Sequence, residues 1–385
     1  MNRISIITLP VLVVGALALG GCTRSDVAIN PPGGTYLSTS AGASFEQSVA
    51  GHGEAKAIAS LDLGKIHRSL RDPNTIFMAA GEDGMVISKD DGVTWSIIST
   101  SLTGTVDVAL LNSGVMVATG VDADGQGVVV RSLDEGKSWQ NVFTLPLAQQ
   151  PKRLQILGSS QAINPVITAM EVDPANGDSI WAGTNEGTLF VATQAAKVWQ
   201  KNTEITSSTV LVTGNRSGVG VVSLEVPLRR PGEVVVVTRD KRLFWVKGGS
   251  ATAIVVPESS SSLAFGGVTG NRNVIDVALV PGFPDALVIG TDTGAVVTRD
   301  GGKTFLEMQL PLDASKRIGG MAVAISPTNV NRFVIAIGGI VYRSEDAGAS
   351  WQTTGVGPVG FAVTDISINP KNAARVLAVL KATQS

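Results

Sequence analysis

The chain has 385 residues, and its hydrophobic content of 44% is sufficient for a large folded core. Glycine is abundant at 44 residues while aromatic residues make up only 5%, which favours strands joined by tight turns over helices. The formal net charge of −2 lacks the basic excess of a nucleic-acid-binding protein. The two histidines, His52 and His67, are too few for a metal centre and are expected at the surface. We therefore predict no metal and no cofactor.

The N-terminus has the layout of an export signal. Residues 1–3 carry a positive charge, residues 4–19 are apolar, and Leu19-Gly20-Gly21-Cys22 follows at once, a run that resembles a lipobox. The resemblance implies a signal peptide over residues 1–21 and acylation, for example with palmitate, at Cys22, which is the only cysteine. A membrane-spanning anchor is the alternative, but 16 apolar residues interrupted by Pro10 are short for a hydrocarbon core of about 30 Å. Residues 22–33 then form a tether, and residues 34–385 the folded domain.

An eight-residue pattern of Ser/Thr, any, Asp, any, Gly, any, Ser/Thr, aromatic occurs four times. In this pattern the aspartate can accept backbone N–H bonds across a turn, the glycine suits a positive φ, and the aromatic residue covers the turn. We therefore predict a structural role and no catalytic role for these residues. They are Ser88, Asp90, Gly92 and Trp95, then Asp134, Gly136 and Trp139, then Asp300, Gly302 and Phe305, then Asp346, Gly348 and Trp351.

Degenerate copies complete the repeat. Residues 38–45 keep the pattern with Ser40 in place of the aspartate, and residues 192–199 keep only the spacing and a final Trp199. The copies thus start at positions 38, 88, 132, 192, 298 and 344, and the gap of 106 residues between the fourth and fifth is about two ordinary repeats. A hairpin of residues 242–246 and 251–256 supplies the missing copy, which gives seven repeats.

Upstream of each copy, an apolar strand, a Pro or Asn turn and a second strand recur, so each repeat has four strands. The sequence therefore predicts an all-β fold, a seven-bladed β-propeller of four-stranded antiparallel blades. The last strand pair, residues 362–368 and 375–380, has no copy after it, and the first copy has no strand pair before it. We expect these C-terminal strands to complete the N-terminal blade and close the ring.

Long connections between blades are the predicted binding surface, because loops on a rigid scaffold usually carry recognition. The longest are residues 145–165, 201–218 and 258–273, on the face opposite the repeated turns. Arginine side chains gathered there could bind carboxylates or phosphates, although each could equally be a turn residue with a partner inside the protein. The candidate binding residues are Lys152, Arg153, Arg216, Arg272 and Arg317.

Residues 33–385 resemble the Asp-box propellers, whose motif is also called the bacterial neuraminidase repeat. This class includes sialidases, xyloglucanases, sortilin-type receptor domains and the lipid-anchored or lumenal photosystem II assembly factors. A sialidase would need an Arg-Ile-Pro motif, which the chain lacks, and a nucleophilic tyrosine, for which only Tyr36 and Tyr342 are available.

Polysaccharide hydrolysis is the stronger enzymatic hypothesis, because it needs a pair of carboxylates. Glu171, Glu225 and Asp276 are the candidates on innermost strands, with Asp107 and Asp365 at what is expected to be the same blade position. Their alternative role is to line a hydrated central channel.

We therefore predict a noncatalytic lipoprotein of the cell envelope, anchored to the outer membrane or to the outer leaflet of the cytoplasmic membrane. It would be a monomer that binds a protein partner as an assembly scaffold. The alternative is an extracytoplasmic glycoside hydrolase or glycan-binding protein.

Overall fold

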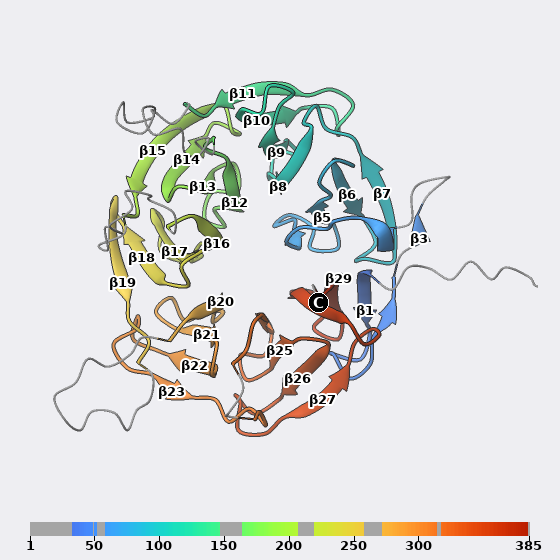
Figure 1. Cartoon of the computed structure of the whole chain (residues 1–385), viewed down its shortest axis with the longest axis vertical. Helices are drawn as coiled ribbons and strands as arrows, with labels where there is room; N and C mark the ends of the chain where they lie inside the picture. The colour runs from blue at the N-terminus through green and yellow to red at the C-terminus, as the bar shows by residue number, and fades with distance from the viewer. Residues whose placement is uncertain are drawn as a thin grey trace, which may run out of the picture. The chain divides into compact units, whose positions relative to one another are not determined.

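The computed structural model describes residues 33–48, 50–51, 58–146, 164–206, 219–257, 272–313 and 317–383. These residues form seven β-sheets arranged as a ring, together with one short 3-10 helix, η1 (Ile58–Ser60) (Figure 1). The predicted all-β, seven-bladed propeller is confirmed. The proposed signal peptide, Cys22 and nearly all of the tether lie outside the described residues. Among the residues described, no helix is long and apolar enough to cross a membrane.

The strands of each blade run in order from the centre of the ring to its rim (Figure 1). Blades 1 to 4 are β28 (Phe361–Ile368), β29 (Val376–Ala382), β1 (Gly34–Ser38) and β2 (Glu46–Gln47); β4 (His67–Arg68), β5 (Ile76–Ala79), β6 (Met85–Ser88) and β7 (Thr94–Ile98); β8 (Gly104–Leu110), β9 (Met116–Val121), β10 (Gly127–Ser132) and β11 (Gln140–Thr144); and β12 (Ile167–Val172), β13 (Ile180–Thr184), β14 (Thr188–Thr193) and β15 (Val198–Glu204).

Blades 5 to 7 follow the same order. They are β16 (Val221–Glu225), β17 (Glu233–Thr238), β18 (Leu243–Lys247) and β19 (Ser250–Ile254); β20 (Val274–Leu279), β21 (Leu287–Thr291), β22 (Gly294–Thr298) and β23 (Leu306–Glu307); and β24 (Met321–Ile325), β25 (Phe333–Ile337), β26 (Ile340–Ser344) and β27 (Gln352–Gly355). The hairpin of β18 and β19 is the repeat that the spacing predicted. The sequence did not predict β3 (Ala50–Gly51), which pairs in parallel with the outer strand β7.

The hydrophobic core is divided into seven clusters, and each cluster joins two neighbouring blades. The second strand of a blade packs against a neighbour on both faces, so its residues are apolar without alternation. Strand β17, with four consecutive valines that are at most 1% exposed, is an example. Each blade therefore depends on both of its neighbours for burial.

The ring is closed as predicted, by pairing between the two ends of the chain. Strand β1 pairs antiparallel with β29, from Gly34 opposite Leu380 to Ser38 opposite Val376. The first blade thus takes two strands from each end of the chain.

The repeated turns have one hydrogen-bonding scheme. In blade 2, the Asp90 carboxylate accepts hydrogen bonds from the Thr94 backbone N–H at 2.8 Å and the Thr94 hydroxyl at 2.6 Å, and Ser88 Oγ accepts one from the Gly92 N–H at 2.8 Å. Asp91 and Gly92 both have positive φ, 61° and 83°. The same bonds form around Asp134, Asp300 and Asp346.

These bonds favour the ionised carboxylates of the turns. Hydrogen bonds from the Ser138 hydroxyl and N–H lower the pKa of Asp134 to about 2, and those from Ser350 lower the pKa of Asp346 to about 2. In the degenerate first copy, Ser40 Oγ takes the place of the carboxylate and accepts the Ser44 N–H at 3.0 Å. The turn thus survives the loss of its aspartate.

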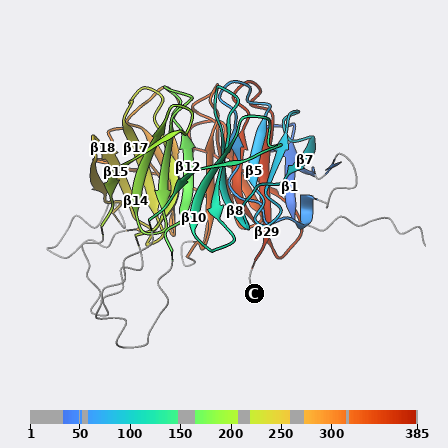
Figure 2. The same cartoon turned by 90° about the horizontal axis from the view of Figure 1, so that it is seen from above.

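The two sides of the ring differ in the connections they carry. Because successive strands are antiparallel, the turns between first and second strands lie on the same side as the repeated turns between third and fourth strands. We call this side the box face. The turns between second and third strands lie on the other side, the connection face, where the outermost strand of one blade ends and the innermost strand of the next begins. Figure 2 shows the strands running from one face to the other.

Candidate functional site

The innermost strands place charged residues at two levels around the axis of the ring, not at one blade position as expected. Asp107, Asp276 and Asp365 each follow a bulge in the innermost strand of their blade and lie four residues before its first turn. In blade 2 that place belongs to Lys65, four residues before Ser69. The second level, two residues further along the chain, holds His67, Glu171 and Glu225.

The three aspartates connect neighbouring blades. Oδ2 of Asp365 accepts the Ile66 N–H of blade 2 at 2.6 Å, and Oδ2 of Asp107 accepts the Met170 N–H of blade 4 at 2.6 Å. Asp276 does the same for Val323 of blade 7 at 2.8 Å. Each bond joins the innermost strand of one blade to that of the next. Asp276, a candidate catalytic residue, is thus engaged in a structural bond.

Lys65 reaches from blade 2 to blade 5 across the centre of the ring. Its Nζ lies 3.3 Å from Oε1 of Glu225, 3.8 Å from Oε2 of Glu171 and 3.3 Å from Oγ of Ser223. Burial alone would lower the pKa of Lys65, but the surrounding carboxylates, Glu225 and Glu171 first, raise it above its usual value. The ammonium is therefore charged and neutralises part of the acidic centre.

His67 is buried, which corrects the expectation that it lies at the surface. Its Nε2 lies 2.7 Å from Oδ1 of Asp107, its Nδ1 lies 3.9 Å from Oε2 of Glu171, and its ring stacks on Phe77. Only 7% of the residue is exposed. Burial would lower the pKa of His67, but the charge and hydrogen bond of Asp107 raise it above the usual value. His67 thus connects blades 2, 3 and 4.

The environment of Glu171 favours its protonated form. Burial raises its pKa to about 7, against the opposing charges of Lys65 and His67, while 29% of its side chain remains exposed. Burial and the neighbouring Asp365 likewise raise the pKa of Asp276 to about 7. We call Lys65, His67, Asp107, Glu171 and Glu225 the central cluster. Within the described part of the chain, no group of three or more His, Cys, Asp or Glu side chains is arranged so that it could hold a metal ion.

The central cluster makes stability depend on pH. A group whose pKa is higher in the folded state stabilises the protein below its unfolded pKa, and this contribution is lost as pH rises through the folded pKa. For Glu171 the window runs from its usual pKa of 4.5 to about 7. We expect this loss to be absent from Glu171→Gln. Between pH 5 and pH 8, the free energy of unfolding of the wild type should therefore fall by about 1–2 kcal/mol more than that of the variant, after allowance for solvent screening, or roughly 2–4 °C in Tm.

Thermal unfolding at pH 5, 6.5 and 8 checks this expectation. Glu135→Gln is the control, because the Glu135 side chain is 75% exposed at the rim of the ring. If Glu171→Gln and Glu135→Gln change the pH profile equally, the environment assigned to Glu171 is wrong.

The candidate binding arginines do not gather in the described part of the connection face. Arg272 is 5% exposed and is bound by Glu307, with Nη1 3.0 Å from Oε2, so it is not displayed at the surface as expected. Arg317 is mostly exposed, and its Nη1 lies 3.3 Å from Oδ2 of Asp292. Lys152, Arg153 and Arg216 lie outside the described residues. Of the long connections, residues 201–204 belong to strand β15.

Comparisons with known proteins show a similar fold in solved structures but no match to a sequence family. No protein-family model matches the chain, and no curated protein matches its sequence. YCF48 from Cyanidioschyzon merolae is 17% identical with a TM-score of 0.55, over 83% of this chain and 95% of that chain. The GH74 xyloglucanase from Xanthomonas campestris is 14% identical with a TM-score of 0.59, over 86% of this chain and 52% of that chain.

A complex described as YCF48 bound to D1 peptide is 15% identical with a TM-score of 0.50, over 84% of this chain and 94% of that chain. This chain thus matches nearly the full length of YCF48 but only about half of the xyloglucanase. At these identities the likeness establishes the fold alone.

Proposed function

We propose that this chain is a noncatalytic, lipid-anchored scaffold of the cell envelope that binds a protein partner through its connection face. The observation that carries the proposal is the engagement of the carboxylates at the centre of the ring. Asp107, Asp276 and Asp365 accept backbone N–H groups of the next blade, while Glu171 and Glu225 share Lys65. A hydrolase needs one carboxyl group as acid and a second as free base or nucleophile. In this arrangement each of these carboxylates already has a partner that competes with either role.

Two further points support a binding role. A propeller of similar fold, YCF48, is bound to a D1 peptide, so a ring of this kind can hold a protein segment. The repeated turns have the residues of the Asp-box, and their carboxylates are used within the turn, which leaves the connection face for recognition. The lipobox resemblance at Cys22 supplies the anchor, since two acyl chains give stable membrane attachment.

A glycoside hydrolase is the second candidate, and the environment of Glu171 favours it. A carboxyl group with a pKa of about 7 that remains partly exposed is a suitable general acid, with Glu225 on the other side of Lys65. The xyloglucanase likeness agrees with this hypothesis, although it covers about half of that enzyme.

Crosslinking and co-purification from membranes of the native host, quantified by mass spectrometry, tests the scaffold. We expect a protein partner that is recovered with the wild type and lost with Arg153→Glu/Arg216→Glu. The control is Lys89→Glu/Lys137→Glu, which reverses two charges on the box face. In the same preparation, Cys22→Ser should move the protein to the soluble fraction.

The opposite result is equally specific. If no partner is recovered above background, and if the chain hydrolyses a polysaccharide and loses this activity in Glu171→Gln, the function is that of a hydrolase and the scaffold proposal is rejected. Membrane retention of Cys22→Ser would reject the lipid anchor.

A further inference from the structure

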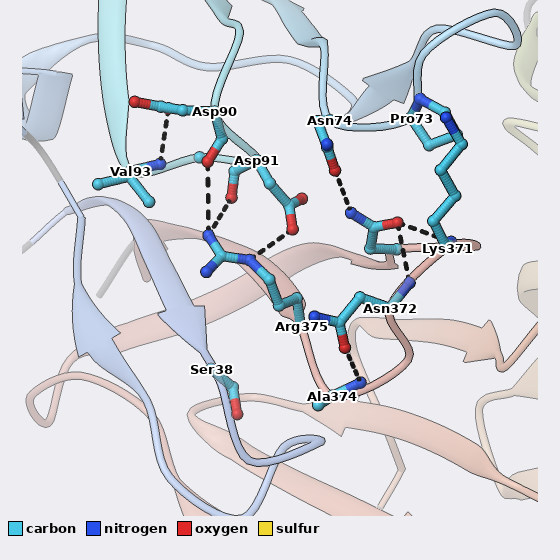
Figure 3. A network of polar contacts seen from close by, with 12 residues as sticks. Ser38, Pro73, Asn74, Asp90, Asp91, Val93, Lys371, Asn372, Ala374 and Arg375 are labelled. Carbon is cyan, nitrogen blue, oxygen red and sulfur yellow. Dashed lines mark hydrogen bonds and ion pairs between the residues drawn. The ribbon is translucent and has the colours of Figure 1, made fainter.

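On the box face, the turns of blades 1 and 2 meet at a junction that we call a crevice, and charged side chains fill it. Nε of Arg375, from the first turn of blade 1, donates a hydrogen bond to Oδ2 of Asp91, from the repeated turn of blade 2 (Figure 3). Nη1 of Arg68 binds the other oxygen of Asp91. Asp91 is 3% exposed, so the three side chains close this crevice.

The crevice between blades 6 and 7 has alanine at both corresponding places. Ala286 corresponds to Arg375, because each closes the first turn of its blade with its carbonyl, at 3.0 Å from the N–H of Val280 and of Asn369 respectively. Ala347 corresponds to Asp91, because each follows the aspartate of a repeated turn and donates its N–H to the first turn at 2.8 Å. The ion pair is therefore absent from the crevice between blades 6 and 7.

A cavity of 260 Å³ occupies this second crevice. It is larger than the cavity of about 150 Å³ that holds benzene in an apolar protein core, so it can accept an aromatic or a large aliphatic side chain. Its walls are mainly apolar and come from the first turns of both blades and from β22 and β25. They include Val280, Phe283, Val297, Val330 and Phe333. Phe283 is 56% exposed, which is unusual for so large an apolar side chain.

One charged residue, Arg299, lines the cavity. Two acidic groups beside the same turn have other partners: Asp285, whose carbonyl accepts the Gly301 N–H, binds Nη2 of Arg230 at 2.6 Å, and Asp300 accepts the N–H and hydroxyl of Thr304. Among the described residues, none forms an ion pair with Arg299. The cavity is thus an apolar recess beside a guanidinium group that has no ion-pair partner. A carboxylate is the group that would neutralise this charge.

We propose that the crevice between blades 6 and 7 is a second binding site, on the face opposite the connection loops, for an acidic peptide segment. The cavity takes one aromatic or large aliphatic side chain, and Arg299 binds a carboxylate one or two residues away, in the bidentate geometry that guanidinium groups favour. The binding is reversible and does not depend on the connection face.

Selection from a library of phage-displayed random heptapeptides against the detergent-solubilised full chain tests this site. We expect the selected peptides to pair Phe, Trp, Leu or Ile with a nearby Asp or Glu. A fluorescein-labelled selected peptide should then bind at least tenfold more weakly to Arg299→Glu, which removes the cation, and to Val330→Trp, which fills the cavity from its rim.

Two controls identify the site. Lys89→Glu reverses the charge at the place in blade 2 that corresponds to Arg299, and Arg153→Glu/Arg216→Glu alters the connection face. Both should bind the labelled peptide as the wild type does, even if the scaffold proposal fails. Absence of the apolar–acidic pairing, or unchanged binding to Arg299→Glu, would overturn the proposal. Because Arg299 is exposed, its variant should fold and remains informative if Val330→Trp does not.

Discussion

Removal of residues 362–385 should abolish the cooperative unfolding of the whole ring. The truncation deletes nearly all of β28 and all of β29, and β1 then loses its partner from Gly34 to Ser38. Residues of β29 also belong to two of the seven hydrophobic clusters, between blades 7 and 1 and between blades 1 and 2. The loss therefore opens the ring and leaves two blades without a packing surface.

Circular dichroism during thermal unfolding, together with hydrogen exchange, measures this effect. The wild type should show one transition, and the truncated chain a broad loss of signal with little exchange protection. A chain that lacks only residues 384–385 is the control and should melt as the wild type does. An unchanged transition in the longer truncation would show that the seven blades do not depend on closure.

Asp91→Ala should lower the free energy of unfolding by about 3–5 kcal/mol, the usual consequence of removing one partner from a buried ionic network. Asp91 is the common acceptor for Arg68 and Arg375, and 9% of the Arg68 side chain is exposed. Figure 3 shows the contact of Asp91 with Arg375. Burial lowers the pKa of Arg68, against the stabilising bond from Asp91. Without the carboxylate, two cations would remain in the crevice between blades 1 and 2. The midpoint of urea unfolding gives the loss.

Asp72→Ala is the matched control for this variant. Its carboxylate lies 3.7 Å from Nζ of Lys371 between the same two blades, but both side chains are at least half exposed. Removal of such a pair changes stability by roughly 0–1 kcal/mol. In addition, Asp91→Ala/Arg375→Ala should be more stable than Asp91→Ala alone, because the double variant leaves one cation fewer without a partner. If Asp91→Ala and Asp72→Ala lose equal stability, Asp91 does not stabilise the junction between blades 1 and 2.

The blade count and the closure could be predicted because both depend on local, repeated patterns. A turn with Asp90 and Gly92 forms from neighbouring residues alone, so each copy marks one blade wherever it occurs. The spacing predicts the blade without a copy, and the strands missing at one end and left over at the other predict the closure of the ring. Periodicity predicts which elements exist and in what order.

The central cluster was only half predicted. The sequence predicts Asp107, Glu171 and Glu225 as carboxylates on innermost strands. It does not predict Lys65 and His67 there, because the innermost strand of blade 2 is reduced to His67–Arg68. A positional signal was present all the same. Lys65 lies four residues before Ser69, as Asp365 lies four before Asn369. The partner of Lys65 across the ring depends on how seven blades meet, which no local pattern contains.

Arg272 shows the same limit for a binding residue. The run Thr-Gly-Asn precedes both Arg272 and Arg216 in sequence, and an arginine after such a run can point to solvent or into the protein. The choice is made by Glu307, 35 residues later in the outer strand β23. An ion pair between residues so far apart in sequence cannot be predicted from the residues around Arg272.

The pairing of Gly34 with Leu380 also determines when the protein can become a ring during its synthesis. Strand β1 meets its partner β29 only after the six intervening blades have been made, and contacts so distant along a chain form slowly. Until then the nascent chain keeps an unpaired edge at each end, exposed to chaperones. A polypeptide that remains open until β29 has been made can still be threaded through a secretion channel, as the predicted export signal would require.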